Sequence, residues 1–148
     1  MTKEIIEKYG IDFQNKIDEY GRIDKFPGAN QNSYITSLLF EWNADELDDS
    51  DHGLLADIDE ALSNPKSEIE NGSTPVLIVI YQNVVKFYPS WGDGEVATMP
   101  TTDLREIVAG WRDFLLTPPL NGTHVLLSPI TICRLAITKL KGIFYKKH

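Results

Sequence analysis

The chain has 148 residues, a length that fits one domain with a core of its own, so a single domain over residues 1–148 is expected. Its 42% hydrophobic and 24% charged residues are typical of a folded protein. The net charge of −8 argues against binding to nucleic-acid phosphates or anionic membranes, because both need basic patches. We find neither an apolar run of about 20 residues nor a signal-peptide core, so we expect a cytoplasmic protein.

The first forty residues are predicted to hold two helices and a loop. Apolar residues three or four apart predict a helix over residues 2–20, with Thr2 as its N-cap and Gly10 as a weak point that could split it. Residues 21–32 are rich in turn formers, which predicts a loop. Residues 33–42 fit helical spacing better than alternation, although their β-branched and aromatic content leaves a strand open.

Another amphipathic helix is predicted in the most acidic part of the chain. Leu54, Leu55 and Ile58 begin an apolar face that stops near Asn64, which precedes a proline. Asp51 is expected to cap the N-terminus of this helix, where a carboxylate satisfies free N–H groups and the helix dipole.

The clearest sheet signal lies between residues 76 and 98. The continuous apolar run at 76–81 predicts a strand buried on both faces, and residues 82–83 fit a tight turn. Residues 84–88 would return as the hairpin partner, and a third short strand is expected at 95–98. These signals predict an α+β fold, with helices packed on a small, mainly antiparallel sheet around a central hairpin at about 76–88.

Two further helices follow the sheet signal. Thr101 or Thr102 is expected to cap the first, and the apolar side chains on its buried face are Leu104, Ile107, Val108, Trp111 and Leu115. Ser128-Pro129 is a suitable start for a C-terminal helix.

The sequence contains no complete catalytic or cofactor motif. Its three histidines fit no zinc-binding spacing, and there is neither a nucleophile elbow nor a phosphate loop. An EF-hand register centred on Gly53 would put His52 at the fifth position and Asp59 at the twelfth, which spoils a calcium site. The lone Cys133 lies in an apolar run and is interpreted as a core residue. We therefore expect no enzymatic activity, no metal and no cofactor.

Charge is distributed unevenly along the chain. Residues 41–60, here called the acidic segment, hold nine carboxylates, and no Lys or Arg lies between Lys25 and Lys66. Close like charges destabilise a fold, whereas a basic partner would turn them into faster association. A partner-binding surface and a plain solvated face both stay open. The candidate partner-binding residues are Glu41, Asp45, Glu46, Asp48, Asp49, Asp51, Asp57 and Glu60, with Tyr88 and Trp91 as candidate aromatic anchors.

The stretch "VLIVIYQNVVKFYPSW", followed after a loop by "MPTTDLREIVAGWRDFLL", resembles a segment of small immunity proteins of bacterial toxin–immunity systems, including the contact-dependent growth inhibition type. There, a hydrophobic hairpin precedes a proline-started helix that ends in Trp-x-x-Phe-Leu, here Trp111, Phe114 and Leu115. The resemblance covers residues 76–116. It implies a cytosolic inhibitor that binds a cognate, basic, nuclease-type toxin domain and occludes its active site, and it carries over no functional residues.

Two other interpretations of the chain stay open. One is an acidic adaptor or regulatory domain with a different basic partner. The other is a small ligand-binding domain or enzyme whose pocket residues are too scattered to recognise.

Overall fold

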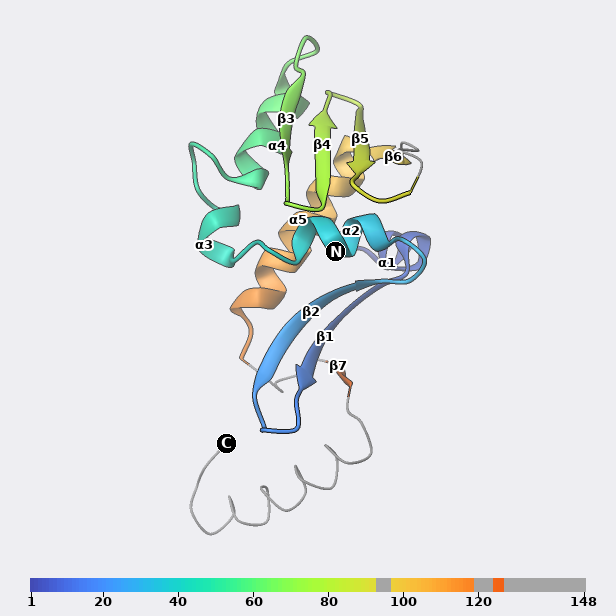
Figure 1. Ribbon diagram of the computed structural model, residues 1–148. Coiled ribbons are helices and arrows are strands. Elements are labelled where there is room, and N and C mark those ends of the chain that lie inside the picture. The colour runs from blue at the N-terminus through green and yellow to red at the C-terminus, as the bar shows by residue number, and fades with distance from the viewer. Residues whose placement is uncertain (93–96, 119–123, 127–148) are drawn as a thin grey trace. The chain divides into compact units, whose positions relative to one another are not determined.

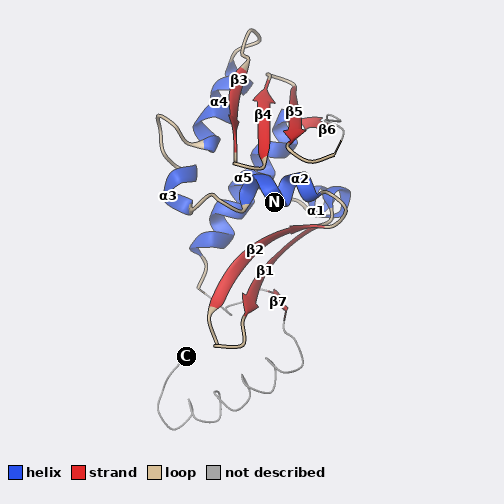
Figure 2. Cartoon of the chain, in the orientation of Figure 1, coloured by secondary structure: helices blue, strands red, loops and turns tan. Residues whose placement is uncertain are grey.

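The computed structural model describes residues 1–92, 97–118 and 124–126 (Figure 1, Figure 2). The described residues fall into two compact units: a larger one of residues 1–12 and 27–117, and a smaller one of residues 13–26, 118 and 124–126. A single domain stays a prediction. The elements are α1 (Lys3–Tyr9), β1 (Ile11–Ile17), β2 (Ile23–Ala29), α2 (Ser33–Leu39), α3 (Ala44–Leu47), α4 (Leu54–Ser63), β3 (Ile69–Gly72), β4 (Val76–Ile80), β5 (Val84–Pro89), β6 (Ala97–Pro100), α5 (Thr101–Leu116) and β7 (His124–Leu126).

The larger unit contains an antiparallel sheet of four strands in the order β3-β4-β5-β6. The predicted hairpin is confirmed as β4 and β5, and the Tyr81 N–H donates to the Val84 carbonyl across the two-residue turn. The third strand is confirmed too, but its described part begins at residue 97. Strand β3 was not predicted, since Ile69 is its only large apolar residue.

Helices cover one face of this sheet, and α4 and α5 lie behind the strands in Figure 1. Ile78 and Phe87 pair across β4 and β5 and are fully buried, and the edge of the Tyr34 ring of α2 meets Phe87 at 4.8 Å between ring centroids. Ile58 of α4 and Ile107 of α5 are also fully buried. The predicted α+β fold, with helices packed on a mainly antiparallel sheet, is therefore confirmed.

The opposite face of the sheet is partly open to solvent. Cross-strand partners point to the same face, so Leu77 lies beside Tyr88, and Val79 beside Lys86 and Glu70. Leu77 is 47% exposed. The prediction that the 76–81 strand is buried on both faces is thus wrong at Leu77.

The first predicted helix stops at half its expected length. Thr2 caps it as predicted, because its hydroxyl oxygen accepts the Ile5 N–H. Gly10 then adopts a left-handed conformation with φ 63°, which ends the helix, and the chain continues as β1. The predicted helix over 11–20 and the predicted loop over 21–32 are both wrong, because β1 and β2 form there. Phe13 and Ile17 lie four residues apart, a spacing that fits a helix as well as a strand, and pairing with the neighbouring strand decides between the two.

The smaller unit contains the hairpin tip between β1 and β2, and β7 runs parallel to β1. Gly21 has φ 80° and donates its N–H to the Asp18 carbonyl. The Asp18 carboxylate accepts the Tyr20 and Arg22 N–H groups and pairs with the Arg22 guanidinium at 2.6 Å. The predicted C-terminal helix and Cys133 lie outside the described residues.

The helix α5 starts differently from the prediction. Pro100 occupies its N-cap position, and no side chain caps it. Thr101 is buried and its hydroxyl donates to the Tyr81 carbonyl, so the β4–β5 connection takes the hydroxyl that was expected to cap the helix. The helix that was favoured for residues 33–42 is confirmed over residues 33–39, which form α2.

Candidate partner-binding surface

The acidic segment folds into α3, a tight loop and α4. Eight of its nine carboxylates are exposed, and Asp57 is half-buried. Asn43 caps α3: its side-chain oxygen accepts the Glu46 N–H at 2.8 Å, and its amide donates to the Glu46 carboxylate at 2.6 Å. This reciprocal pair fixes the start of the segment and gives Glu46 a structural role.

The loop between α3 and α4 is shaped by Asp49 rather than by Asp51. The Asp49 carboxylate accepts the N–H groups of Asp51 and His52, which lower the pKa of that carboxyl below its ordinary value. Gly53 occupies the N-cap position of α4 and donates its N–H to the Asp49 carbonyl. The prediction that Asp51 caps α4 is therefore wrong, because the loop turns back on Asp49 before the helix begins.

Two arginines of α5 lie against the acidic segment. Arg112 contacts Asp48 at 2.8 Å and Asp113 at 3.1 Å, and the hydrogen bond that it donates to the Asp48 carboxylate raises the pKa of its guanidinium. Arg105 contacts Asp59 at 3.0 Å. The long stretch without Lys or Arg is thus partly compensated by cations that follow much later in the chain.

Neutral groups hold two other carboxylates of the segment. The Asn71 amide of β3 donates to Asp57 at 2.6 Å, and the Thr74 N–H of the β3–β4 turn donates to Glu41 at 2.9 Å. Both contacts tie the acidic segment to the sheet. Asp57 and Glu41 therefore have structural roles that do not require a partner.

Three carboxylates remain, Asp45, Asp51 and Glu60, here called the open carboxylates. All three are exposed. Within the described part of the chain, their side chains make no hydrogen bond and no ion pair. In the described structure, the charges of these three candidate residues therefore stabilise no contact within the fold.

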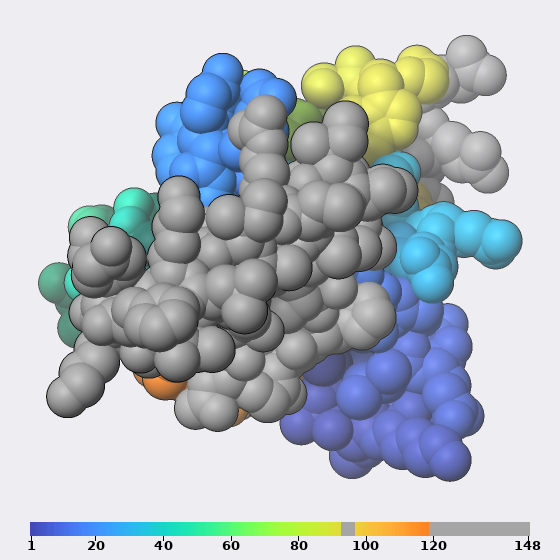
Figure 3. All heavy atoms as spheres, turned by 90° about the horizontal axis from the view of Figure 1, so that it is seen from below, coloured from blue at the N-terminus to red at the C-terminus, as the bar shows by residue number. Residues whose placement is uncertain are grey.

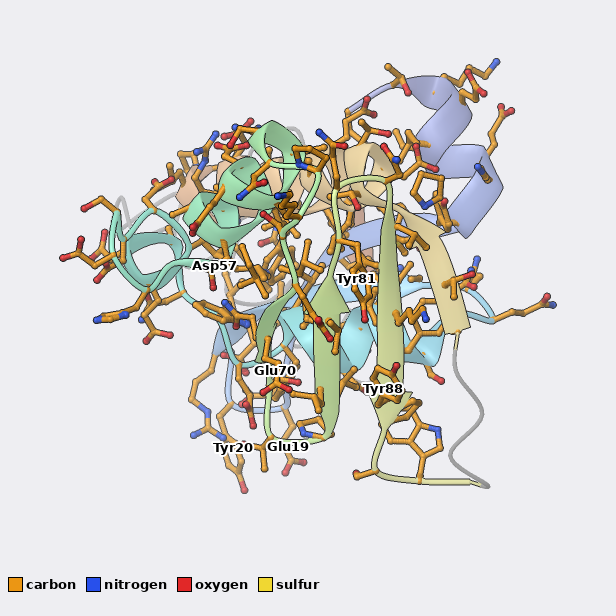
Figure 4. All side chains as sticks on the ribbon, turned by 90° about the horizontal axis from the view of Figure 1, so that it is seen from above. Glu19, Tyr20, Asp57, Glu70, Tyr81 and Tyr88 are labelled. Atoms are coloured by element: carbon orange, nitrogen blue, oxygen red, sulfur yellow. The ribbon has the colours of Figure 1, made fainter. Side chains whose placement is uncertain are left out.

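The two candidate aromatic anchors lie away from the acidic segment. Tyr88 is half-buried on the open sheet face, and Figure 4 shows it and Asp57 on opposite sides of β4. Trp91 is 42% exposed and follows β5, whose end reaches the surface seen in Figure 3 (yellow). The candidate residues therefore do not form one surface: the carboxylates lie on the acidic segment, and the two aromatic residues lie elsewhere on the larger unit.

One exposed aromatic residue does lie next to the acidic segment and was not predicted. Phe40 follows the last residue of α2 and is 64% exposed. The sequence carried a signal for it, because Phe40 does not belong to the set Ile35, Leu38, Leu39 that forms the buried face of the helix.

The structure offers no obvious metal centre or membrane segment among the residues it describes. No three or more His, Cys, Asp and Glu side chains gather there in a way that could hold a metal ion. No described helix has both the length and the apolar character needed to cross a bilayer.

Comparisons with protein-family models, with curated proteins and with solved structures give no match. The resemblance to immunity proteins therefore stays a prediction.

Proposed function

We propose that this chain is an immunity-type inhibitor, which binds a basic bacterial toxin domain through its acidic segment and covers the active site of that domain. The observation that carries the proposal is the set of open carboxylates. They are exposed, they lack cationic partners in the described chain, and they are carried by a backbone that the rest of the fold holds in place.

The rigidity of the segment matters for binding. The contacts of Arg105, Arg112 and Asn71 reach it from α5 and β3. A surface that is already ordered loses little conformational entropy when a partner binds. The paired carboxylates thereby support the backbone that presents the open ones.

The charge of the surface specifies the chemistry of the partner. Exposed carboxylates attract Lys and Arg side chains, and this attraction accelerates association most strongly at low salt. A nuclease-type toxin binds the phosphates of its substrate in a cationic cleft, where a carboxylate cluster could replace those phosphates. Occlusion of such a cleft would involve an interface of about 1,600 Å².

The test measures binding to the protein encoded by the neighbouring gene, where the gene of a cognate toxin is expected, at low and at physiological salt. The triple variant D45N/D51N/E60Q removes the open carboxylates and no contact that the structure shows. We expect its dissociation constant to rise about tenfold at low salt, mainly through slower association, and the difference to shrink as salt increases.

A matched control removes the same charge elsewhere. The variant E4Q/D24N/E70Q neutralises three exposed carboxylates that lie outside the acidic segment. We expect it to bind almost as the parent chain does. If both triple variants weaken binding equally, net charge rather than this surface attracts the partner; if neither does, the proposed function is wrong.

A further inference from the structure

Helix α2 is followed by Phe40, an aromatic residue whose side chain is exposed to solvent. Ile35, Leu38 and Leu39 of this helix have no exposed surface, whereas Phe40 is 64% exposed. Its ring makes no contact with another aromatic ring or a cation among the described residues. A Phe side chain has no polar group that could form a hydrogen bond with water. Exposure of its ring is therefore unfavourable compared with burial.

The backbone that carries Phe40 is fixed from several sides. Its N–H donates to the Thr36 carbonyl at 3.0 Å, and the Thr36 hydroxyl donates to the Pro27 carbonyl at 2.8 Å. On the neighbouring turn of the helix, the Ser37 carbonyl accepts the Ser73 hydroxyl at 2.8 Å. The next residue, Glu41, accepts the Thr74 N–H. Only the two side-chain torsions of Phe40 are left to be ordered on binding.

From this position we infer that Phe40 is the aromatic anchor of the interface, and that it enters an apolar pocket rimmed by Lys or Arg side chains on the partner. The inference rests on the proposed function, because it uses the same partner. The Lys or Arg side chains at the rim of the pocket are inferred from charge complementarity. Glu41 follows Phe40 directly, and the open carboxylate Asp45 lies four residues further along. An aromatic ring buried in a pocket at the centre of an interface, with polar residues at the rim, is a common arrangement of an interface hot spot.

The two other exposed aromatic side chains among the described residues fit this role less well. Tyr20 is 74% exposed, but its ring already faces the Arg22 guanidinium at 5.3 Å and it belongs to the smaller unit. Trp91 is 42% exposed and follows β5 rather than the acidic segment. Phe40 combines high exposure, a fixed backbone and adjacent carboxylates.

The experiment compares Phe40→Ala with Tyr20→Ala, which removes an even more exposed ring elsewhere in the chain. Both variants are titrated against the protein of the neighbouring gene and against an oligolysine peptide, which offers charge without a pocket. We expect Phe40→Ala to raise the dissociation constant for the protein at least about tenfold through faster dissociation, with its salt dependence unchanged. Weak binding of oligolysine should not change, and Tyr20→Ala should behave as the parent chain.

Each outcome separates the anchor from the charged surface. If Phe40→Ala changes the dissociation constant less than about twofold while D45N/D51N/E60Q still weakens binding, the anchor is wrong and the proposed function stands. An equal loss in Tyr20→Ala also overturns the anchor, because exposed aromatic area in general would then explain it. If the parent chain does not bind the protein at all, both proposals are overturned.

Discussion

The carboxylates of the acidic segment form two groups that the sequence does not distinguish. Asp48 and Asp59 pair with arginines of α5, and Asp57 binds Asn71 of β3. Asp45 and Asp51, by contrast, face water in the described structure. A run of like charge in a sequence can therefore be a structural feature in one part and a candidate interface in another, and only the fold shows which carboxylates belong to which group.

The largest effect is expected where the shape of the segment depends on the backbone. A Cβ atom at Gly53 would lie 2.3 Å from the Asp49 carbonyl oxygen and 2.8 Å from that of Leu47. Gly53→Ala must therefore displace the loop, and we expect it to lower the free energy of unfolding by about 2–3 kcal/mol. Urea unfolding measures this loss.

Gly21→Ala is the control for this prediction. Gly21 has nothing within 4 Å of the added Cβ, so only its left-handed conformation is strained, at about 1–2 kcal/mol. Equal losses in the two variants would show that the crowding around Gly53 does not fix the segment.

The next effect concerns the hydrogen bond between β3 and α4. Asn71→Ala leaves the half-buried Asp57 carboxylate without its amide donor, and we expect a loss of about 1.5–3 kcal/mol. The double variant Asn71→Ala/Asp57→Ala should lose less than the sum of the single variants, because neither partner is then left alone. Strict additivity in this double-mutant cycle would mean that the two side chains do not depend on each other.

The division of the carboxylates could not be predicted from the sequence, for a physical reason. Helix α4 and the β4–β5 hairpin show themselves in local periodicity, and both are confirmed. The contact between Arg112 and Asp48 joins residues 64 positions apart, and no local pattern reports it. Strands β1 and β2 were missed for another reason: Phe13 and Ile17 fit a helix as well as a strand, so the spacing of apolar residues does not decide between the two.

A smaller effect should separate the two groups of carboxylates directly. D48N/D59N breaks two exposed ion pairs with α5, and we expect each to contribute less than about 1 kcal/mol. D45N/D51N carries the same charge change but breaks no contact, so its stability should equal or slightly exceed that of the parent chain. Thermal unfolding at low salt, where surface pairs are least screened, gives the comparison. Equal losses in both variants would contradict the division into two groups.

The smallest effect is a pH dependence that distinguishes Asp49 from its neighbour Asp51. The N–H groups of Asp51 and His52 favour the charged form of the Asp49 carboxyl and lower its pKa from the ordinary value of 3.8. The unfolded chain therefore takes up the proton at a higher pH than the folded chain. The resulting stabilisation is complete above pH 3.8 and disappears as pH falls through the lowered value.

Asp49→Asn retains an oxygen that can accept both N–H groups but does not titrate, so the parent chain should be more stable than this variant near neutral pH and should lose that advantage in acid. Asp51→Asn is the matched charge control, because the Asp51 side chain accepts no hydrogen bond in the described structure. Urea midpoints across this pH range test the distinction, and a gap of constant size for Asp49→Asn would show that its charge does not hold the loop.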